Sequence, residues 1–137
     1  MEILVAQPCG FCYGVKRAVA LAEKAAADKV QGGTYGPLIH NPQFIEALSK
    51  KGIPCKDKLE AFRPGETVII RSHGVGPEVY AQAKSLQLNI LDATCPNVRL
   101  AQQKAHQAAL DGFLPIIIGE KNHPEVKSIL EWAGKTG

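Results

Sequence analysis

The sequence predicts an α/β fold in which short strands alternate with helices and pair mostly in parallel. Short apolar or β-branched runs recur along the chain at residues 3–6, 34–39, 67–70, 88–91 and 113–118. Segments with apolar residues at three- and four-residue spacing, which is typical of amphipathic helices, separate these runs. Glycine or proline stands at most of the junctions, where it ends one helix or begins the next. Strands that alternate with helices in this way favour a parallel sheet with helical crossovers.

The first predicted strand and helix flank a turn that contains two cysteines, Cys9 and Cys12. Residues 3–6 form an apolar run that suits a buried parallel strand. After the turn, one face of the predicted helix carries Val15, Ala18, Val19, Ala22, Ala25 and Ala26. This helix is expected to end before Gly32, and residues 34–39 predict a weaker strand.

Proline marks the start of every later helix. Asn41 followed by Pro42 predicts an N-cap and the first helical residue, and Gly52 ends that helix. Residues 54–64 are polar and loop-like. The three remaining helices are expected to begin at Pro77, Pro96 and Pro124.

The pattern also predicts a boundary between two units. We expect a first α/β domain at residues 1–95 and the opening part of a second, similar domain at residues 96–137. Only one clear strand, at 113–118, follows this boundary, so the second domain looks truncated.

Composition excludes several classes of protein. Hydrophobic residues make up 45% and charged residues 21%, as in a globular chain. A net charge of +3 and only 6% aromatic residues give no basic stacking surface for nucleic acid. No apolar run approaches the roughly 18 residues of a membrane span, and the first residues lack the basic region of a signal peptide. We therefore expect a cytoplasmic protein with no membrane contact, whose four cysteines serve metal binding or catalysis rather than disulfides.

One local pattern recurs at five junctions: a predicted strand ends, a cysteine or histidine follows, and glycine or proline opens a helix. The residues are Cys12, His40, His73, Cys95 and His123. Parallel strands end at the same edge of a sheet, where open α/β sheets bind ligands, so we expect these five side chains to converge. Taken singly, each has a simpler interpretation, because such a cysteine is often a buried thiol and such a histidine a helix cap. The fourth histidine, His106, lies within a helix and is expected at the surface.

The residue types divide the predicted chemistry. Thiolates are ligands that iron–sulfur clusters and zinc prefer, whereas histidines near helix N-termini suit an anion such as phosphate. The chain has neither a Walker-type loop nor a G-x-G-x-x-G motif, so a small phosphorylated substrate is favoured over a nucleotide. Cys9 and Cys12 also form a C-x-x-C pair, which is half of a zinc site or a redox pair, but no second pair completes it. Glu125 is either a proton carrier beside the anion or a simple first-turn helix acid.

Five segments together resemble the motifs of the 4-hydroxy-3-methylbut-2-enyl diphosphate reductase family (LytB/IspH type), in the same order and spacing. They are GFCYGVKRAV at 10–19, HN at 40–41, SHGV at 72–75, DATCP at 92–96 and HPEV at 123–126. The resemblance implies an iron–sulfur enzyme of the non-mevalonate isoprenoid pathway that forms isopentenyl and dimethylallyl diphosphate. Two electrons would arrive one at a time from a ferredoxin or flavodoxin.

The resemblance also implies a role for each candidate residue. Cys12 and Cys95 would be ligands of a [4Fe-4S] cluster. His40, His73 and His123 would hold the substrate diphosphate, and Glu125 would deliver the proton to the leaving hydroxyl.

The chain also departs from the family. It is about half as long, and the family's third cluster cysteine would lie beyond residue 137, whereas Cys9 and Cys55 match no family ligand. We therefore expect the N-terminal part of such a reductase, which could be inactive alone and could self-associate through exposed sheet edges. Two alternatives stay open: a degenerate, non-enzymatic binding or assembly module of the same fold, and a small zinc protein that uses Cys9 and Cys12.

Overall fold

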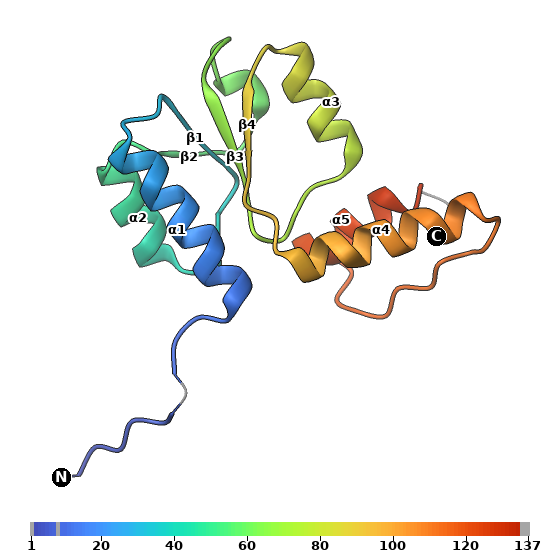
Figure 1. The fold of residues 1–137 in the computed structure, drawn as a ribbon, viewed down its shortest axis with the longest axis horizontal. Helices are drawn as coiled ribbons and strands as arrows, with labels where there is room; N and C mark the ends of the chain where they lie inside the picture. The colour runs from blue at the N-terminus through green and yellow to red at the C-terminus, as the bar shows by residue number, and fades with distance from the viewer. Residues whose placement is uncertain (1, 8, 135–137) are drawn as a thin grey trace.

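The computed structural model describes residues 2–7 and 9–134, in which a parallel sheet is covered by helices (Figure 1). Its strands are β1 (Gly32–Tyr35), β2 (Cys55–Lys56), β3 (Thr67–Ile70) and β4 (Asn89–Asp92). The helices are α1 (Tyr13–Ala27), α2 (Pro42–Lys50), the 3-10 turn η1 (Leu59–Ala61), α3 (Pro77–Ser85), α4 (Pro96–Leu110) and α5 (Pro124–Trp132). The strand order is β2-β1-β3-β4, and every described pairing is parallel, so the predicted α/β class is confirmed.

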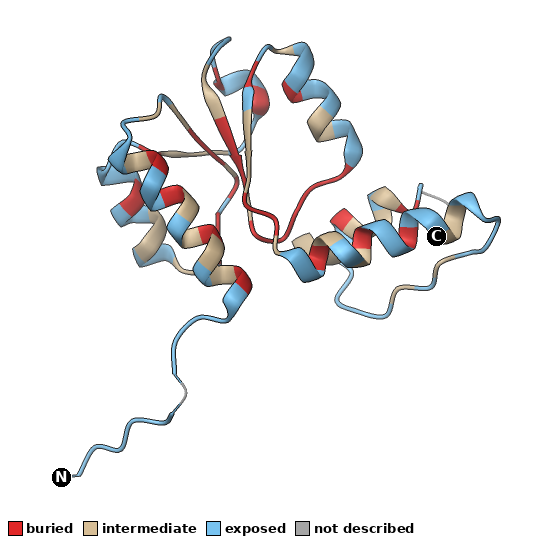
Figure 2. Ribbon diagram, in the orientation of Figure 1, coloured by how far each residue is buried: buried red, intermediate tan, exposed pale blue. Residues whose placement is uncertain are grey.

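Successive residues of β3 face opposite sides of the sheet, and this alternation divides the core into two layers. Ile69 packs in a cluster that includes Ala18 and Ala22 of α1 and Leu48 of α2. The neighbouring Val68 and Ile70 belong to a second cluster on the other face, with side chains from η1 and α3. Both clusters are buried, and helices therefore cover the sheet on both faces (Figure 2).

The predicted helix starts are confirmed where Asn41 or proline marks them. The Asn41 Oδ1 accepts a 2.9 Å hydrogen bond from the Phe44 amide, so it satisfies one free N–H at the start of α2. Pro42, Pro77, Pro96 and Pro124 each occupy the first position of a helix.

The pair Gly32 and Gly33, expected only to follow a helix end, begins β1 itself. A Cβ on Gly32 would overlap the Thr67 carbonyl of β3, and one on Gly33 would overlap the Pro54 carbonyl beside β2. The strand therefore starts two residues earlier than predicted, because glycine allows three backbones to approach closely. The short strand β2 lies within the region 54–64 that was expected to be a loop.

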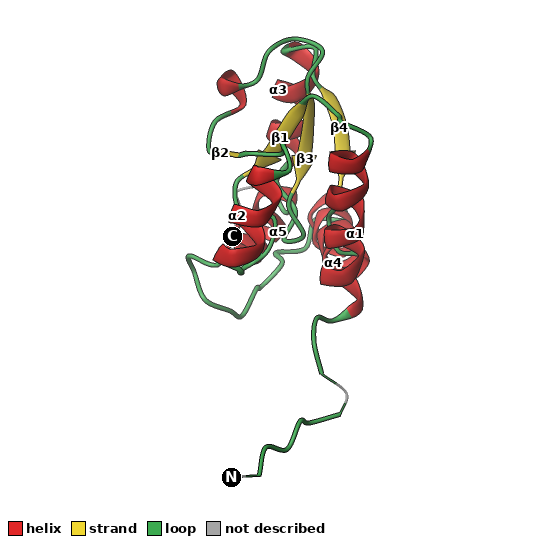
Figure 3. Ribbon diagram, turned by 90° about the vertical axis from the view of Figure 1, so that its left-hand side faces the viewer, coloured by secondary structure: helices red, strands yellow, loops and turns green. Residues whose placement is uncertain are grey.

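Two predicted strands, 3–6 and 113–118, are wrong. Neither is paired with a strand in the part of the chain that the structure describes; Figure 3 draws both segments as loops, and the first runs away from the body. Ile3 is 75% and Ile118 97% exposed. These segments have strand-like side chains, but a strand also needs a neighbour to accept and donate its backbone hydrogen bonds.

Helices α4 and α5 pack against each other beside the sheet rather than on one of its faces (Figure 1). The boundary predicted near residue 95 falls between β4 and α4 and stays a prediction. Among the described helices, none is long and apolar enough to cross a membrane.

Candidate functional site

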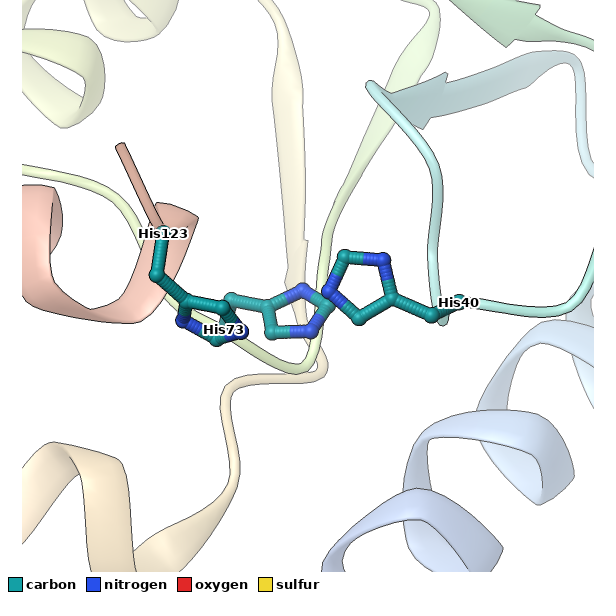
Figure 4. Close-up of side chains that lie close together, drawn as sticks. All are labelled: His40, His73 and His123. Carbon is teal, nitrogen blue, oxygen red and sulfur yellow. The ribbon is translucent and has the colours of Figure 1, made fainter. Parts of the chain in front are cut away.

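Three histidines from distant parts of the chain meet at one point (Figure 4). One side-chain nitrogen from each of His40, His73 and His123 lies within 4.8 Å of the other two. The ring centroid of His40 is 4.4 Å from that of His73 and 5.5 Å from that of His123, and the remaining pair is 5.6 Å apart. The structure therefore brings together the three histidines that the sequence selected.

The loops after β1 and β3 position the first two histidines. Both the backbone amide and the hydroxyl of Ser72 donate to the Leu38 carbonyl, at 3.1 and 3.0 Å. Leu38 and Ile39 are buried beneath the sheet edge, so the next residue, His40, is held at the surface beside His73. This pair of hydrogen bonds joins the two loops and holds the backbones of the two histidines near each other.

Helix α5 brings the third histidine. His123 is the N-cap residue of α5, and its Nδ1 accepts a 3.3 Å hydrogen bond from the Glu125 amide. One turn later, the Ser128 hydroxyl lies 2.9 Å from the His73 carbonyl oxygen and 2.8 Å from the Glu125 carbonyl oxygen. Trp132 Nε1 donates to the Val75 carbonyl at 2.9 Å, so α5 is attached to the His73 loop at two points.

The interior behind His73 is polar and tightly packed. Gln102 of α4 is completely buried, and its Nε2 donates to Ser128 Oγ at 3.2 Å. Gly74 has a positive φ of 73°, and a Cβ there would overlap the Gln102 side chain. Glycine is therefore required next to His73 for both its backbone conformation and its lack of a side chain.

His73 is electrostatically distinct from an ordinary histidine. It is only 9% exposed, and this burial, together with the nearby His40, Arg71 and His123, lowers its pKa from 6.5 to about 4. Its Nδ1 is buried and has no hydrogen-bond partner among the described residues. A neutral imidazole with a buried, unpartnered ring nitrogen suits a ligand that supplies the missing contact.

The two candidate thiols occupy equivalent positions, each at the N-cap of a helix. Cys12 precedes α1 and Cys95 precedes α4, both are free, and neither side chain forms a capping hydrogen bond. The Cys95 sulfur lies directly against Gly14 in the first turn of α1, where any Cβ would overlap it. The contact with Gly14 brings Cys95 to the N-terminal turn of the helix that Cys12 precedes.

Ion pairs and hydrogen bonds hold the turn that carries Cys95. Arg17 of α1 donates to the carbonyls of Thr94 at 3.1 Å and Asp92 at 3.4 Å. The Asp92 carboxylate pairs with Arg99 and accepts hydrogen bonds from the Thr94 amide and the Tyr80 hydroxyl. Burial acts to raise the Asp92 pKa, but hydrogen bonding by Thr94 and the charge of Arg99 outweigh it and hold the pKa below its usual value.

The remaining candidates lie outside these two groups. Glu125 is half-buried in the first turn of α5, but the group of mutually close ligand atoms contains imidazoles alone. Among the described residues, no third ligand completes a metal site with Cys9 and Cys12, which are both exposed, and Cys55 lies in β2. His106 is exposed on α4, as predicted.

The rule that selected the site was only partly right. It placed every candidate after a strand, yet the strands expected before Cys12 and His123 do not form. Cys12, Cys95 and His123 are instead helix N-cap residues, and His40 directly precedes the N-cap Asn41. His73 lies in the loop between β3 and α3. Sequence reasoning also missed the supporting residues Arg17, Arg71, Gln102 and Ser128. Only Arg17 lies within the motifs quoted, and a supporting role depends on packing that spacing alone does not show.

The fold is that of an α/β protein, and its candidate site lies where helices begin near the ends of parallel strands. The chain belongs to the LytB family, whose model, described as LytB protein, matches residues 3–137. The chain is 44% identical to a 4-hydroxy-3-methylbut-2-enyl diphosphate reductase of Dehalococcoides mccartyi (strain CBDB1). This alignment covers all 137 residues of the chain and 48% of the D. mccartyi protein. A protein of the same name from Aquifex aeolicus is 44% identical over 92% of the chain and 44% of its own length.

Two solved structures are similar over almost the whole chain. The first is a structure of (E)-4-hydroxy-3-methyl-but-2-enyl diphosphate reductase, the terminal enzyme of the non-mevalonate pathway. It matches with a TM-score of 0.81 and 42% identity, and the match covers 95% of this chain and 46% of the other chain. The second is a structure of the E-1-hydroxy-2-methyl-but-2-enyl-4-diphosphate reductase from Plasmodium falciparum. It matches with a TM-score of 0.90 and 31% identity, and the match covers 94% of this chain and 41% of the other chain. The chain therefore spans about half the length of the relatives that it matches.

Proposed function

We propose that this chain supplies the diphosphate-binding site, and two of the cluster ligands, of a reductase that acts on 4-hydroxy-3-methylbut-2-enyl diphosphate. The observation that carries the proposal is the convergence of His40, His73 and His123 within 4.8 Å. The family and the names of its relatives support the choice of substrate. The products would be isopentenyl and dimethylallyl diphosphate.

The histidines can bind an anion without first being protonated. Because Nδ1 of His123 accepts the Glu125 amide, the neutral ring carries its proton on Nε2 and offers it as a donor. Burial lowers the pKa of His73 to about 4, so its imidazole is neutral near pH 7 and has one N–H to donate. The N-terminal ends of α2 and α5, next to His40 and His123, add a favourable potential for negative charge.

Glu125 is proposed to deliver the proton that lets the substrate hydroxyl leave as water. It lies in the first turn of α5, two residues from His123, and is half-buried.

Cys12 and Cys95 are proposed to be two of the ligands of a [4Fe-4S] cluster, which would need a third cysteine besides these two. Their free thiols at two helix N-termini, and the missing side chain at Gly14, fit such a group. When bound, the cluster would pass single electrons from a ferredoxin or flavodoxin to the substrate.

Calorimetric titration with inorganic diphosphate, in a buffer that contains a metal chelator, tests the anion site. We expect the protein to bind diphosphate and His40→Ala to weaken binding by about tenfold or more, the value of one hydrogen bond to a charged group. His106→Ala is the matched control and should bind normally, because His106 is not one of the three close imidazoles; circular dichroism checks that losing its contact with the Trp132 carbonyl leaves the fold intact. Equal binding by His40→Ala and the unaltered protein would contradict the proposal.

A further inference from the structure

We propose that His40, His73 and His123 also form a site for a divalent transition-metal ion such as Zn²⁺ or Co²⁺. This inference goes beyond the proposed function, because the ion would bind the protein without any diphosphate. It concerns the three imidazoles alone, not the thiols of Cys12 and Cys95.

The ring geometry suits a common metal ion. Zinc–nitrogen bonds of about 2.0–2.1 Å in a tetrahedral site separate two ligand nitrogens by about 3.3 Å and two imidazole centroids by about 5 Å. The observed centroid distances of 4.4, 5.5 and 5.6 Å lie on both sides of that value. The ring planes are inclined by 55°, 51° and 79°, so the imidazoles are not stacked and can point towards one ion.

Only a small adjustment is needed to close the site. The ligand nitrogens lie within 4.8 Å of one another, so a pair at that limit must approach by about 1.5 Å to reach the zinc separation of about 3.3 Å. His40 is exposed and His123 is half-buried at the end of a helix, which leaves both side chains room to rotate. His73 is the fixed member, because its backbone carbonyl lies 2.9 Å from the Ser128 hydroxyl.

His73 gives a second, independent indication of a missing ligand. It is 9% exposed, and its Nδ1 has no hydrogen-bond partner in the described part of the chain. A buried polar atom without a partner is costly, and a metal ion bound by this Nδ1 itself would remove that cost. The competing cost is small: if His123 binds metal through Nε2, it loses the long hydrogen bond of 3.3 Å that its Nδ1 accepts from Glu125.

The donor set selects the class of ion. Three imidazoles without a carboxylate or thiolate suit zinc, cobalt or nickel rather than magnesium or calcium, which prefer oxygen ligands. Three protein ligands leave a fourth position for water or a ligand oxygen. The exposed ring of His40 gives an ion access from solvent.

Cobalt titration followed by visible absorption tests the site, in a buffer without phosphate or chelator. The parent protein is a variant with Cys9, Cys12, Cys55 and Cys95 all replaced by serine, which removes the competing thiols. We expect one Co²⁺ per chain, with a d–d spectrum that lacks thiolate charge transfer. His40→Ala and His123→Ala should each weaken binding at least tenfold, whereas His106→Ala should not.

The unaltered protein offers a second measurement if the cysteine-free variant does not fold. Zn²⁺ should then shift the ring C–H resonances of His40, His73 and His123 in NMR spectra and leave those of His106 in place. Binding that is lost with the cysteines, insensitive to His40→Ala, or accompanied by no shift of the three rings would overturn the proposal. Because diphosphate binding is measured with chelator present, the metal site and the anion site can fail independently.

Discussion

At the scale of single residues, His73 makes stability depend on pH. Its pKa is 6.5 in the unfolded chain but about 4 in the folded protein, because burial and nearby positive groups oppose its charged form. Between these two values the unfolded state binds more protons than the folded state. The free energy of unfolding should therefore be highest above about pH 6.5 and fall as the pH falls towards about 4, by up to about 3 kcal/mol.

Urea denaturation across this range, in the presence of a chelator, measures the effect. His73→Asn removes the titrating group and should flatten the dependence on pH, while His106→Asn should leave it unchanged. An equally steep loss of stability in His73→Asn would assign the effect to other groups.

The sequence identified His73 as a candidate but not its neutral state. Its position after a β-branched run and before glycine predicted a residue at the sheet edge, and the structure confirms that location. Its burial depends on Gln102 and Ser128, which lie 29 and 55 residues further along the chain. No local pattern indicates that these helices fold back over the His73 loop.

At the scale of secondary-structure elements, α5 determines the position of His123 through Ser128. The Ser128 hydroxyl lies between the His73 carbonyl, the Glu125 carbonyl and the Gln102 side chain, and it is buried. Ser128→Ala would leave the His73 carbonyl and the Gln102 amide without a buried partner. We expect a loss of about 1–3 kcal/mol in the free energy of unfolding.

The same variant should weaken diphosphate binding, because His123 would no longer be held beside His73. Urea denaturation identifies conditions in which the Ser128→Ala protein is fully folded, and calorimetry then measures its diphosphate affinity in those conditions. A severalfold fall in affinity of the folded protein separates this positioning role from simple destabilisation. Ser85→Ala is the matched control, since the Ser85 hydroxyl donates to the Gln82 carbonyl at the exposed end of α3, away from the histidines. Normal affinity in a folded Ser128→Ala protein would contradict the role.

Helices were more predictable than strands for a physical reason. A helix satisfies its own backbone hydrogen bonds, so Asn41–Pro42 and the later prolines are sufficient to locate its start. A strand is completed by its neighbours, and residues 3–6 and 113–118 have none among the described residues. The strand-like side chains at these positions were correctly recognised, but side-chain pattern alone does not supply a pairing partner.

At the scale of the whole molecule, the site forms between the sheet and the α4–α5 pair. The convergence of His40 and His73 could be predicted, since β1 and β3 are adjacent parallel strands whose loops emerge at one edge. The approach of His123 could not be derived in that way, because the strand expected before it does not form. Its position instead comes from the contacts of Ser128 and Trp132 with the loop that follows β3.

The exposed apolar segments lead to a prediction about association. These segments are residues 3–6 and 113–118, and most of their large apolar side chains are exposed: Ile3, Leu4, Val5, Phe113, Leu114, Ile116 and Ile118. The sheet also ends in β4, whose outer edge is unpaired within the described residues. Because apolar surface of this extent is unusual on a monomer and a free strand edge can pair with another chain, the protein should self-associate as its concentration rises.

Sedimentation velocity over a range of protein concentrations measures this association. Replacing Ile116 and Ile118 by lysine should shift the distribution towards the monomer without altering the far-ultraviolet circular dichroism, because neither side chain contributes to either core cluster. Leu100→Lys on the exposed face of α4 is the control and should associate as the unaltered protein does. A protein that is monomeric at every concentration would show that these segments do not mediate association. An equal shift towards the monomer in Leu100→Lys would assign the effect to the added charge.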